Sequence, residues 1–202
     1  MADQNLNWYT RTYPNFLDDE LCDAYVQMFE ETLEKDAEEV KKTSICTGPV
    51  RPDGHQICGN CNCQRMNPMG FDRFIPLNKI ALNQFLEIVN QYRKDCAIHQ
   101  TQWPQQYAFE QIRLKRYLAN DKDEFAPHVD SMNVESAKRF LVFFIYLDDN
   151  ERGETNFPQL GLASPCKQGS LLMFPPLWPW VHAGMKPVKK PKYMVGSYLH
   201  YT

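Results

Sequence analysis

Residues 125–130 read Phe125-Ala126-Pro127-His128-Val129-Asp130. His128 and Asp130 are two positions apart, and on an extended strand the side chains at i and i+2 point to the same face. An imidazole and a carboxylate with this spacing are able to reach one cation together. A second histidine follows in the stretch Trp180-Val181-His182-Ala183-Gly184. If both stretches are strands that pair, the three side chains meet.

Two histidines and one carboxylate on one side of a cation leave its opposite positions open, which is the ligand set of non-haem Fe(II) sites. A short His-x-Asp pattern also arises by chance. If the pattern arose by chance, His128 and Asp130 form a loop salt bridge or a cap, and His182 is a histidine packed beside Trp178 and Trp180. The order of the features around these residues decides between the two interpretations.

From Tyr107 onward the sequence is typical of short strands. Residues 107–118 contain alternating polar and apolar positions, and residues 139–147 form a nearly continuous apolar run, as expected of a strand covered on both faces. Further strands are predicted at residues 155–157, 170–174, 180–183 and 193–201. Many short strands with turns between them favour a sandwich or a barrel.

Helices are predicted in the first half of the chain. One helix follows a cap at Asp18 or Asp19 and carries apolar residues at helical spacing, and a second starts at a cap at Asn78 and ends near Cys96. Helices first and strands afterwards predict an α+β chain built on a double-stranded β-helix, or jelly roll, with N-terminal supporting helices. We expect one domain over residues 1–202, with helical support and a cysteine-containing loop in 1–106 and the jelly-roll core in 107–202.

An irregular, cysteine-rich segment occupies residues 43–76. Its spacing Cys58-x-x-Cys61-x-Cys63 predicts a structural zinc site with Cys46 or His55 as the fourth ligand. The alternative is a surface loop of unligated thiols. In either case a long loop beside a catalytic barrel is a natural lid over a substrate.

Composition narrows the class of protein. Hydrophobic residues make up 43% of the chain and aromatic residues 13%, as in globular proteins, and the net charge of −3 gives no signal for nucleic-acid binding. The longest apolar run, 171–181, is broken by prolines and is too short to span a membrane. The first residues are polar and do not form a signal peptide, and the seven cysteines are an odd number. These features predict a cytoplasmic protein with free thiols or a metal site rather than a disulfide framework.

The order of the motifs is more specific than any one of them. The series comprises Arg116-Tyr117, His128-Val129-Asp130, Arg139, Tyr146-Leu147-Asp148, residues 153–158, residues 169–174, His182-Ala183-Gly184, Pro187-Val188 and Lys192-Tyr193. In this order the chain resembles the prolyl 4-hydroxylase-like branch of the Fe(II)/2-oxoglutarate-dependent dioxygenases over about residues 107–201. One position departs from the pattern: the family's usual Gly-Gly-Glu-Thr is here Arg152-Gly153-Glu154-Thr155.

The resemblance implies a role for several residues. His128, Asp130 and His182 would hold Fe(II), and Lys192 would pair with the distal carboxylate of 2-oxoglutarate. Tyr146 matches a position that donates a hydrogen bond to the same carboxylate, and Tyr117 matches a tyrosine near the iron and the co-substrate. The implied reaction consumes O2 and 2-oxoglutarate, releases succinate and CO2, and hydroxylates a substrate.

The resemblance favours prolyl residues of a peptide or protein as the substrate. The alternatives are hydroxylation of a free amino acid, a small metabolite or a nucleobase, or a cupin-like barrel that binds metal without turnover. Lys192 and Tyr146 argue against the last, because a simple metal-binding barrel does not need groups for a second carboxylate. Asp130 argues against halogenation, because halogenating relatives lack a carboxylate at this position and leave room for chloride.

Overall fold

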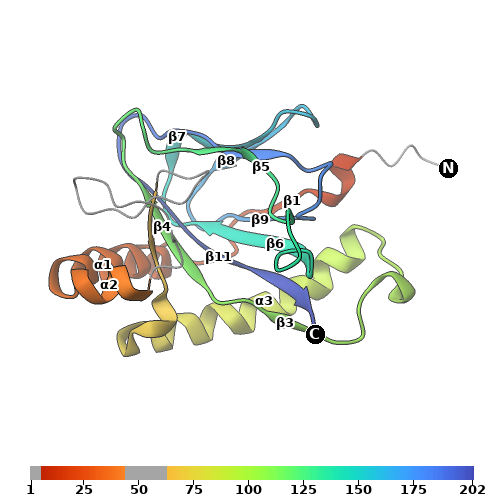
Figure 1. Cartoon of the computed structure of the whole chain (residues 1–202), viewed down its shortest axis with the longest axis horizontal. Coiled ribbons are helices and arrows are strands. Elements are labelled where there is room, and N and C mark those ends of the chain that lie inside the picture. The colour runs from red at the N-terminus through yellow and green to blue at the C-terminus, as the bar shows by residue number, and fades with distance from the viewer. Residues whose placement is uncertain (1–5, 44–62) are drawn as a thin grey trace.

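The computed structural model describes residues 6–43 and 63–202. Two antiparallel sheets face one another, and helices cover the outer face of the larger sheet (Figure 1). This arrangement confirms the predicted α+β jelly roll with supporting helices.

Among the described residues the larger sheet has seven strands. Every pair of neighbours in it is antiparallel. Along the sheet they are β1 (Arg11–Tyr13), β9 (Leu171–Phe174), β6 (Arg139–Tyr146), β11 (Lys192–Tyr201), β4 (Arg113–Tyr117) and β2 (Gln64–Met66), and β3 (Tyr107–Phe109) also pairs with β11.

The smaller sheet contains the stretch that begins at Phe125. Its strands run in the order β5 (Phe125–His128), β10 (His182–Gly184), β7 (Asn150–Phe157) and β8 (Leu162–Cys166). Strand β10 lies between β5 and β7, so both histidine-containing stretches are neighbours in one sheet, as predicted.

The helical elements are three α-helices and several short 3-10 turns within the described residues. They are α1 (Asp19–Lys35), α2 (Ala37–Thr43), α3 (Ile75–Asp95), η1 (Leu6–Tyr9), η2 (Pro68–Gly70), η3 (Asp72–Phe74) and η4 (Gln100–Gln102). Figure 1 shows α1, α2 and α3 on the same side of the larger sheet.

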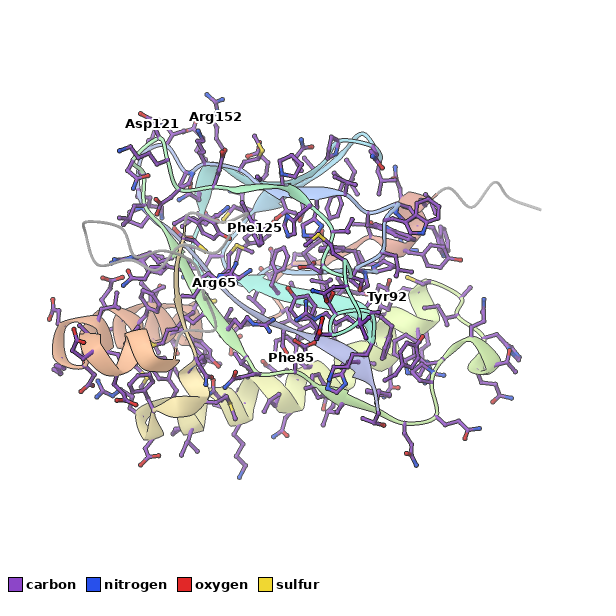
Figure 2. The ribbon with its side chains drawn as sticks, viewed as in Figure 1. Arg65, Phe85, Tyr92, Asp121, Phe125 and Arg152 are labelled. Atoms are coloured by element: carbon purple, nitrogen blue, oxygen red, sulfur yellow. The ribbon has the colours of Figure 1, made fainter. Side chains whose placement is uncertain are left out.

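The main core lies between the helices and this sheet. Alternate residues of β6 point to opposite faces, so Leu141, Phe143 and Ile145 are buried against the helices. Phe85 of α3, labelled in Figure 2, packs on Phe143 with ring centroids 4.3 Å apart. Burying an aromatic side chain of this kind stabilises the fold by about 1.5–3 kcal/mol.

A second core lies between the two sheets. It contains Val142, Phe157, Leu172, Phe174, Trp180 and Tyr198. Strand β6 therefore contributes to both cores, which explains why its sequence is apolar almost throughout.

Gly169 joins the segment that precedes α1 to the larger sheet. Its φ of +70° is in the left-handed region, and a Cβ added there would lie 2.2 Å from the carbonyl oxygen of Leu17. The carbonyl of Gly169 accepts hydrogen bonds from the amides of Phe16 and Leu17. Only glycine satisfies both requirements, so this position fixes where α1 begins relative to β9.

Several predictions of local structure need correction. Asn78 is not a helix cap: α3 begins at Ile75, and Asn78 is buried inside it, where it accepts a hydrogen bond from Tyr25 at 3.2 Å and donates to the carbonyl of Pro68 at 3.3 Å. Strand β8 was not predicted. Strand β2 lies within the segment 43–76 that was expected to be irregular, and it joins the larger sheet.

The described helices include none that is both long and apolar enough to cross a membrane.

Candidate active site

His128, Asp130 and His182 meet at the facing ends of β5 and β10. His128 and His182 are direct partners in the antiparallel register. One ligand atom from each of the three residues lies within 4.8 Å of the others. Asp130 is placed just past the end of β5, with its carboxylate oxygens 3.7 Å from His128 Nε2 and 3.4 Å from His182 Nε2. The structure thus brings together the three residues that the sequence predicted.

Backbone carbonyls orient both imidazole rings. His128 Nδ1 is 2.8 Å from the oxygen of Ala126, and His182 Nδ1 is 3.0 Å from the oxygen of Trp180. A carbonyl oxygen only accepts, so the proton of each neutral ring is on Nδ1, and the lone pair of Nε2 is directed at the cluster. Within the described residues, the buried Nε2 of His128 has no hydrogen-bond partner. A buried nitrogen acceptor without a hydrogen-bond partner is available to coordinate a metal ion.

Asp130 is held by two residues that the sequence did not identify as part of the site. Tyr198, on β11, donates a hydrogen bond of 2.8 Å to Asp130 Oδ1, and Arg139, on β6, donates one of 3.1 Å to the Asp130 carbonyl. Arg139 is itself fixed by Glu110 through two hydrogen bonds of 2.6 and 2.9 Å. The side chain of Arg139 also packs over the ring of Tyr198 at 4.1 Å. No local motif predicts these contacts, because strands far apart in sequence supply them.

The protonation states suit a divalent cation. Burial raises the pKa of Asp130, but the neighbouring histidines outweigh burial and hold this pKa well below its ordinary value. Burial lowers the pKa of His182 to about 4. The cluster therefore presents an ionised carboxylate and a neutral imidazole at His182, the forms that coordinate metal.

A small pocket of about 30 Å³ opens beside the triad. Tyr117, Gly184 and Thr155 contribute to its wall, and Phe125 stacks on His128 with ring centroids 3.6 Å apart. The full lining is Lys115, Tyr117, Phe125, His128, Asp130, Val142, Phe144, Thr155, His182, Gly184, Met194 and Tyr198.

Lys192 lies directly behind this wall. It is fully buried, pairs with Tyr117 in the register of β4 and β11, and places Nζ 4.4 Å from the centroid of the Tyr117 ring. Nζ donates to the carbonyls of Gly153 and Met185 at 3.1 and 2.9 Å. Burial lowers the pKa of Lys192 to about 8, so the ammonium form still predominates at neutral pH.

Gly184 separates Lys192 from the pocket. A Cβ at this position would lie 3.7 Å from Lys192 Nζ and 3.3 Å from Phe125 Cβ. Gly184 is therefore in the pocket lining and also close to the buried ammonium group. Gly184 is two residues after His182, so one short strand supplies both a candidate ligand and this close approach.

Tyr146 and Tyr117 occupy different positions relative to the pocket. Tyr117 is in the lining, whereas Tyr146 is fully buried behind Thr155. The hydroxyl of Tyr146 lies 2.8 Å from Thr155 Oγ1 and accepts a hydrogen bond of 3.2 Å from the Thr155 amide. Tyr146 therefore reaches the pocket through Thr155.

The predicted zinc site falls mainly on residues that the structure does not describe. Cys46, His55, Cys58 and Cys61 lie outside the described residues. Cys63 is buried and disulfide-bonded, which speaks against it as a thiolate ligand. Cys22, Cys96 and Cys166 are buried free thiols.

Comparison with known proteins gives matches at the level of structure alone. No protein-family model matches the sequence, and no curated protein matches it. A viral collagen prolyl hydroxylase from Paramecium bursaria Chlorella virus-1, solved with 2-oxoglutarate, superposes with a TM-score of 0.65 at 18% identity, over 96% of this chain and 97% of the viral chain. The chain has the fold of the prolyl 4-hydroxylases.

Two further solved structures share this fold. A prolyl hydroxylase from Trichoplax adhaerens, in complex with a peptide of hypoxia-inducible factor, gives a TM-score of 0.64 at 13% identity over 95% of this chain and 83% of that one. A non-haem α-ketoglutarate-dependent epimerase from nogalamycin biosynthesis gives 0.62 at 13% identity over 95% and 76%. The resemblance seen in the sequence is thus confirmed for the fold, which serves more than one reaction in these proteins.

Proposed function

We propose that this protein is an Fe(II)- and 2-oxoglutarate-dependent oxygenase that hydroxylates prolyl residues of a peptide or protein. In the overall reaction, one atom of O2 enters the substrate as a hydroxyl group, and the other enters succinate as 2-oxoglutarate loses CO2. The observation that carries the proposal is the convergence of His128, Asp130 and His182 around one point. At this point the buried Nε2 of His128 has no hydrogen-bond partner among the residues that the structure describes.

The donor set fits Fe(II). Two imidazole nitrogens and one carboxylate on one face leave positions for the co-substrate and O2, and the iron would supply the redox chemistry when bound. The protein residues orient and tune these ligands: carbonyls fix the two rings, and Tyr198 and Arg139 fix Asp130.

Lys192 supports 2-oxoglutarate as the co-substrate. An ammonium group has three donors, and two of them already bond to the carbonyls of Gly153 and Met185 among the described residues. The remaining donor, reached past Gly184, would pair with the distal carboxylate. Tyr117 would line the same path, and Tyr146 would contribute through its contact with Thr155 or by turning its hydroxyl toward the co-substrate.

The prolyl substrate rests on the solved structures of the same fold, which include hydroxylases of collagen and of hypoxia-inducible factor as named in those structures. The epimerase of this fold favours a second candidate, oxidation of a small metabolite. A barrel that only binds metal is the weakest alternative, because it leaves the buried Lys192 beside the pocket without a purpose.

The test is succinate formation from 2-oxoglutarate with Fe(II), across proline-containing peptides and free metabolites, with mass spectrometry of the substrate for the added oxygen. His128→Ala, Asp130→Ala and His182→Ala should each abolish turnover while circular dichroism shows an intact fold, because a three-residue ligand set has no spare member. Full activity in any one of these variants, with iron still bound, would exclude the assignment.

A further inference from the structure

Strand β4 presents basic side chains to the interior between the sheets. Lys115 pairs with Met194, and Arg113 pairs with Gly196, in the register of β4 and β11. Since Tyr117 shares their face, Arg113 and Lys115 lie on the side of the sheet that holds the candidate active site. Arg65 of β2 pairs with Lys115 and extends this row by one strand.

Two adjoining pockets meet at Lys115. The pocket beside the triad and a second small one of about 20 Å³ have five lining residues in common: Lys115, Phe144, Met194, Val142 and Tyr198. The second pocket also has Arg113 in its lining. Gly196 keeps that wall close-packed, because a Cβ there would lie 2.4 Å from Phe144 Cβ.

Phe125 connects these cations to the metal ligands. Lys115 Nζ lies 5.1 Å and the Arg65 guanidinium 5.4 Å from the centroid of its ring, and the same ring stacks on His128 at 3.6 Å. Figure 2 shows Arg65 and Phe125 in the space between the two sheets. A group bound by Lys115 would therefore lie next to the place where oxidation occurs.

Several basic side chains lie along this wall. Arg113 and Arg139 share one carboxylate, Glu110, at 3.0 and 2.6 Å. Lys115 adds a further basic side chain, which lines both pockets. A wall of this kind favours an anionic ligand.

We propose that Lys115, supported by Arg113 and Arg65, binds a carboxylate of the substrate close to the carbon that is hydroxylated. This inference rests on the proposed function and adds to it a class of substrate. Lys115 and Lys192 occupy different positions. Lys192 pairs with Tyr117, two residues along β4 from Lys115, so the two lysines are roughly 7 Å apart. Lys192 also lies behind Gly184. Lys192 would thus bind a carboxylate of the co-substrate, and Lys115 would bind a carboxylate of the substrate.

Two sources of a carboxylate are compatible with this wall, and matched probes separate them. The first pair is a blocked peptide with Glu next to Pro and the same peptide with Gln instead of Glu, with a third version that has Lys. The second pair is L-proline and L-prolinamide. Binding is measured by calorimetry on the full chain loaded with Mn(II) and 2-oxoglutarate, so the readout does not depend on turnover.

Wild-type protein should bind the carboxylate member of at least one pair roughly ten- to a hundred-fold more tightly than its neutral partner, the range for one charge-assisted contact. Lys115→Gln should remove this preference, Lys115→Arg should retain most of it, and Lys115→Glu should reverse it toward the Lys-containing peptide. Lys94→Gln is the matched control, because Lys94 is exposed on α3 at the far side of the larger sheet.

The proposal is overturned if neither pair shows a charge preference, if none of the carboxylate probes binds, or if Lys115→Gln leaves the preference intact. It is also overturned if Lys115→Gln weakens binding of 2-oxoglutarate itself, since Lys115 would then serve the co-substrate. Failure of the proposed function appears separately, as an absence of succinate from wild-type protein with Fe(II) while the binding preferences are still measurable.

Discussion

Lys192 combines full burial with a positive charge, and its environment explains how both persist. Burial lowers its pKa to about 8, while Cys166, Asp148 and Glu154 oppose that effect. Two backbone carbonyls solvate the ammonium group in place of water. The group is therefore charged at neutral pH but close to losing its proton.

The KM for 2-oxoglutarate should consequently depend on pH. A folded-state pKa of about 8 means that the protonated form is lost as pH rises through 8, so affinity for a dianion falls above it and is constant below it. We expect KM to rise roughly tenfold between pH 7 and pH 9. In Lys192→Arg the guanidinium stays charged, so its KM should be nearly flat over this range. Steady-state kinetics of succinate release measure both, and parallel profiles in the two proteins would assign the pH effect to another group.

Tyr198 is a positioning residue for the candidate metal centre. Burial and the charge of Asp130 raise its pKa, so it remains a hydrogen-bond donor. Tyr198→Phe should weaken Fe(II) or Mn(II) binding by roughly ten- to a hundred-fold, as is usual for the loss of a contact that orients a ligand. Calorimetric titration of the metal measures this effect.

Tyr13→Phe is the matched control for that experiment. It removes a hydrogen bond of similar length, 2.9 Å, from a tyrosine to Asp95, which is far from the triad in the fold. Equal losses of metal affinity in the two variants would mean that the effect is general rather than directed at Asp130.

At the level of elements, β7 contains the one departure from the family pattern noted in the sequence. Arg152, labelled in Figure 2, stands where a glycine is usual. Its φ of +63° is in the left-handed region. The register of β7 against β8 shifts between Asn150 and Thr155, so the strand bulges at this point. A side chain with a Cβ is strained in this conformation by about 1–2 kcal/mol.

Arg152→Gly should therefore raise the free energy of unfolding by about 0.5–1 kcal/mol, after the greater freedom of glycine in the unfolded chain is subtracted. Arg152 is exposed, so little packing is lost. Urea denaturation measures the change. Arg152→Ala keeps the Cβ and should show no such gain; an equal gain there would attribute the effect to the arginine side chain.

Helix α3 supports the larger sheet through its buried face. Phe85 is 1% exposed and packs on Phe143, whereas the next residue, Leu86, is 50% exposed. Phe85→Ala should destabilise the protein by about 3–5 kcal/mol, and Leu86→Ala by only about 0.5 kcal/mol. Chemical denaturation of both variants compares the two faces of one helix, and similar losses would contradict this packing.

At the scale of the whole molecule, the candidate metal centre joins residues from both sheets. His128 and His182 come from the smaller sheet, while Tyr198 and Arg139 reach Asp130 from the larger one. Occupancy by a divalent cation should therefore stabilise the complete fold and not one strand pair.

Mn(II) at about 100 times its Kd should raise the midpoint of thermal unfolding by about 5–10 °C, since binding at that excess contributes about 2.7 kcal/mol. Asp130→Ala should remove this shift, while the same variant without metal remains folded. Differential scanning calorimetry provides the measurement. An undiminished shift in Asp130→Ala would place the cation at another site.

The sequence by itself determined the class of fold and the candidate ligands. Alternation along residues 107–118, the apolar run at 139–147 and the His-x-Asp spacing are local signals, and each reflects a periodicity of the strand itself. The start of α3 was predicted wrongly, because Asn78 has the side chain of a cap but is used for hydrogen bonds inside the core.

Only the tertiary structure decided which residues surround the ligands. Tyr198 and Arg139 bind Asp130, and Lys115 and Arg65 meet at Phe125, across strands that are distant in sequence. These contacts depend on the register of β4, β6 and β11, where a shift by one residue moves every side chain to the opposite face. Local sequence patterns specify that a strand forms, but the packing of both cores fixes its register, and the register places the charges around the site.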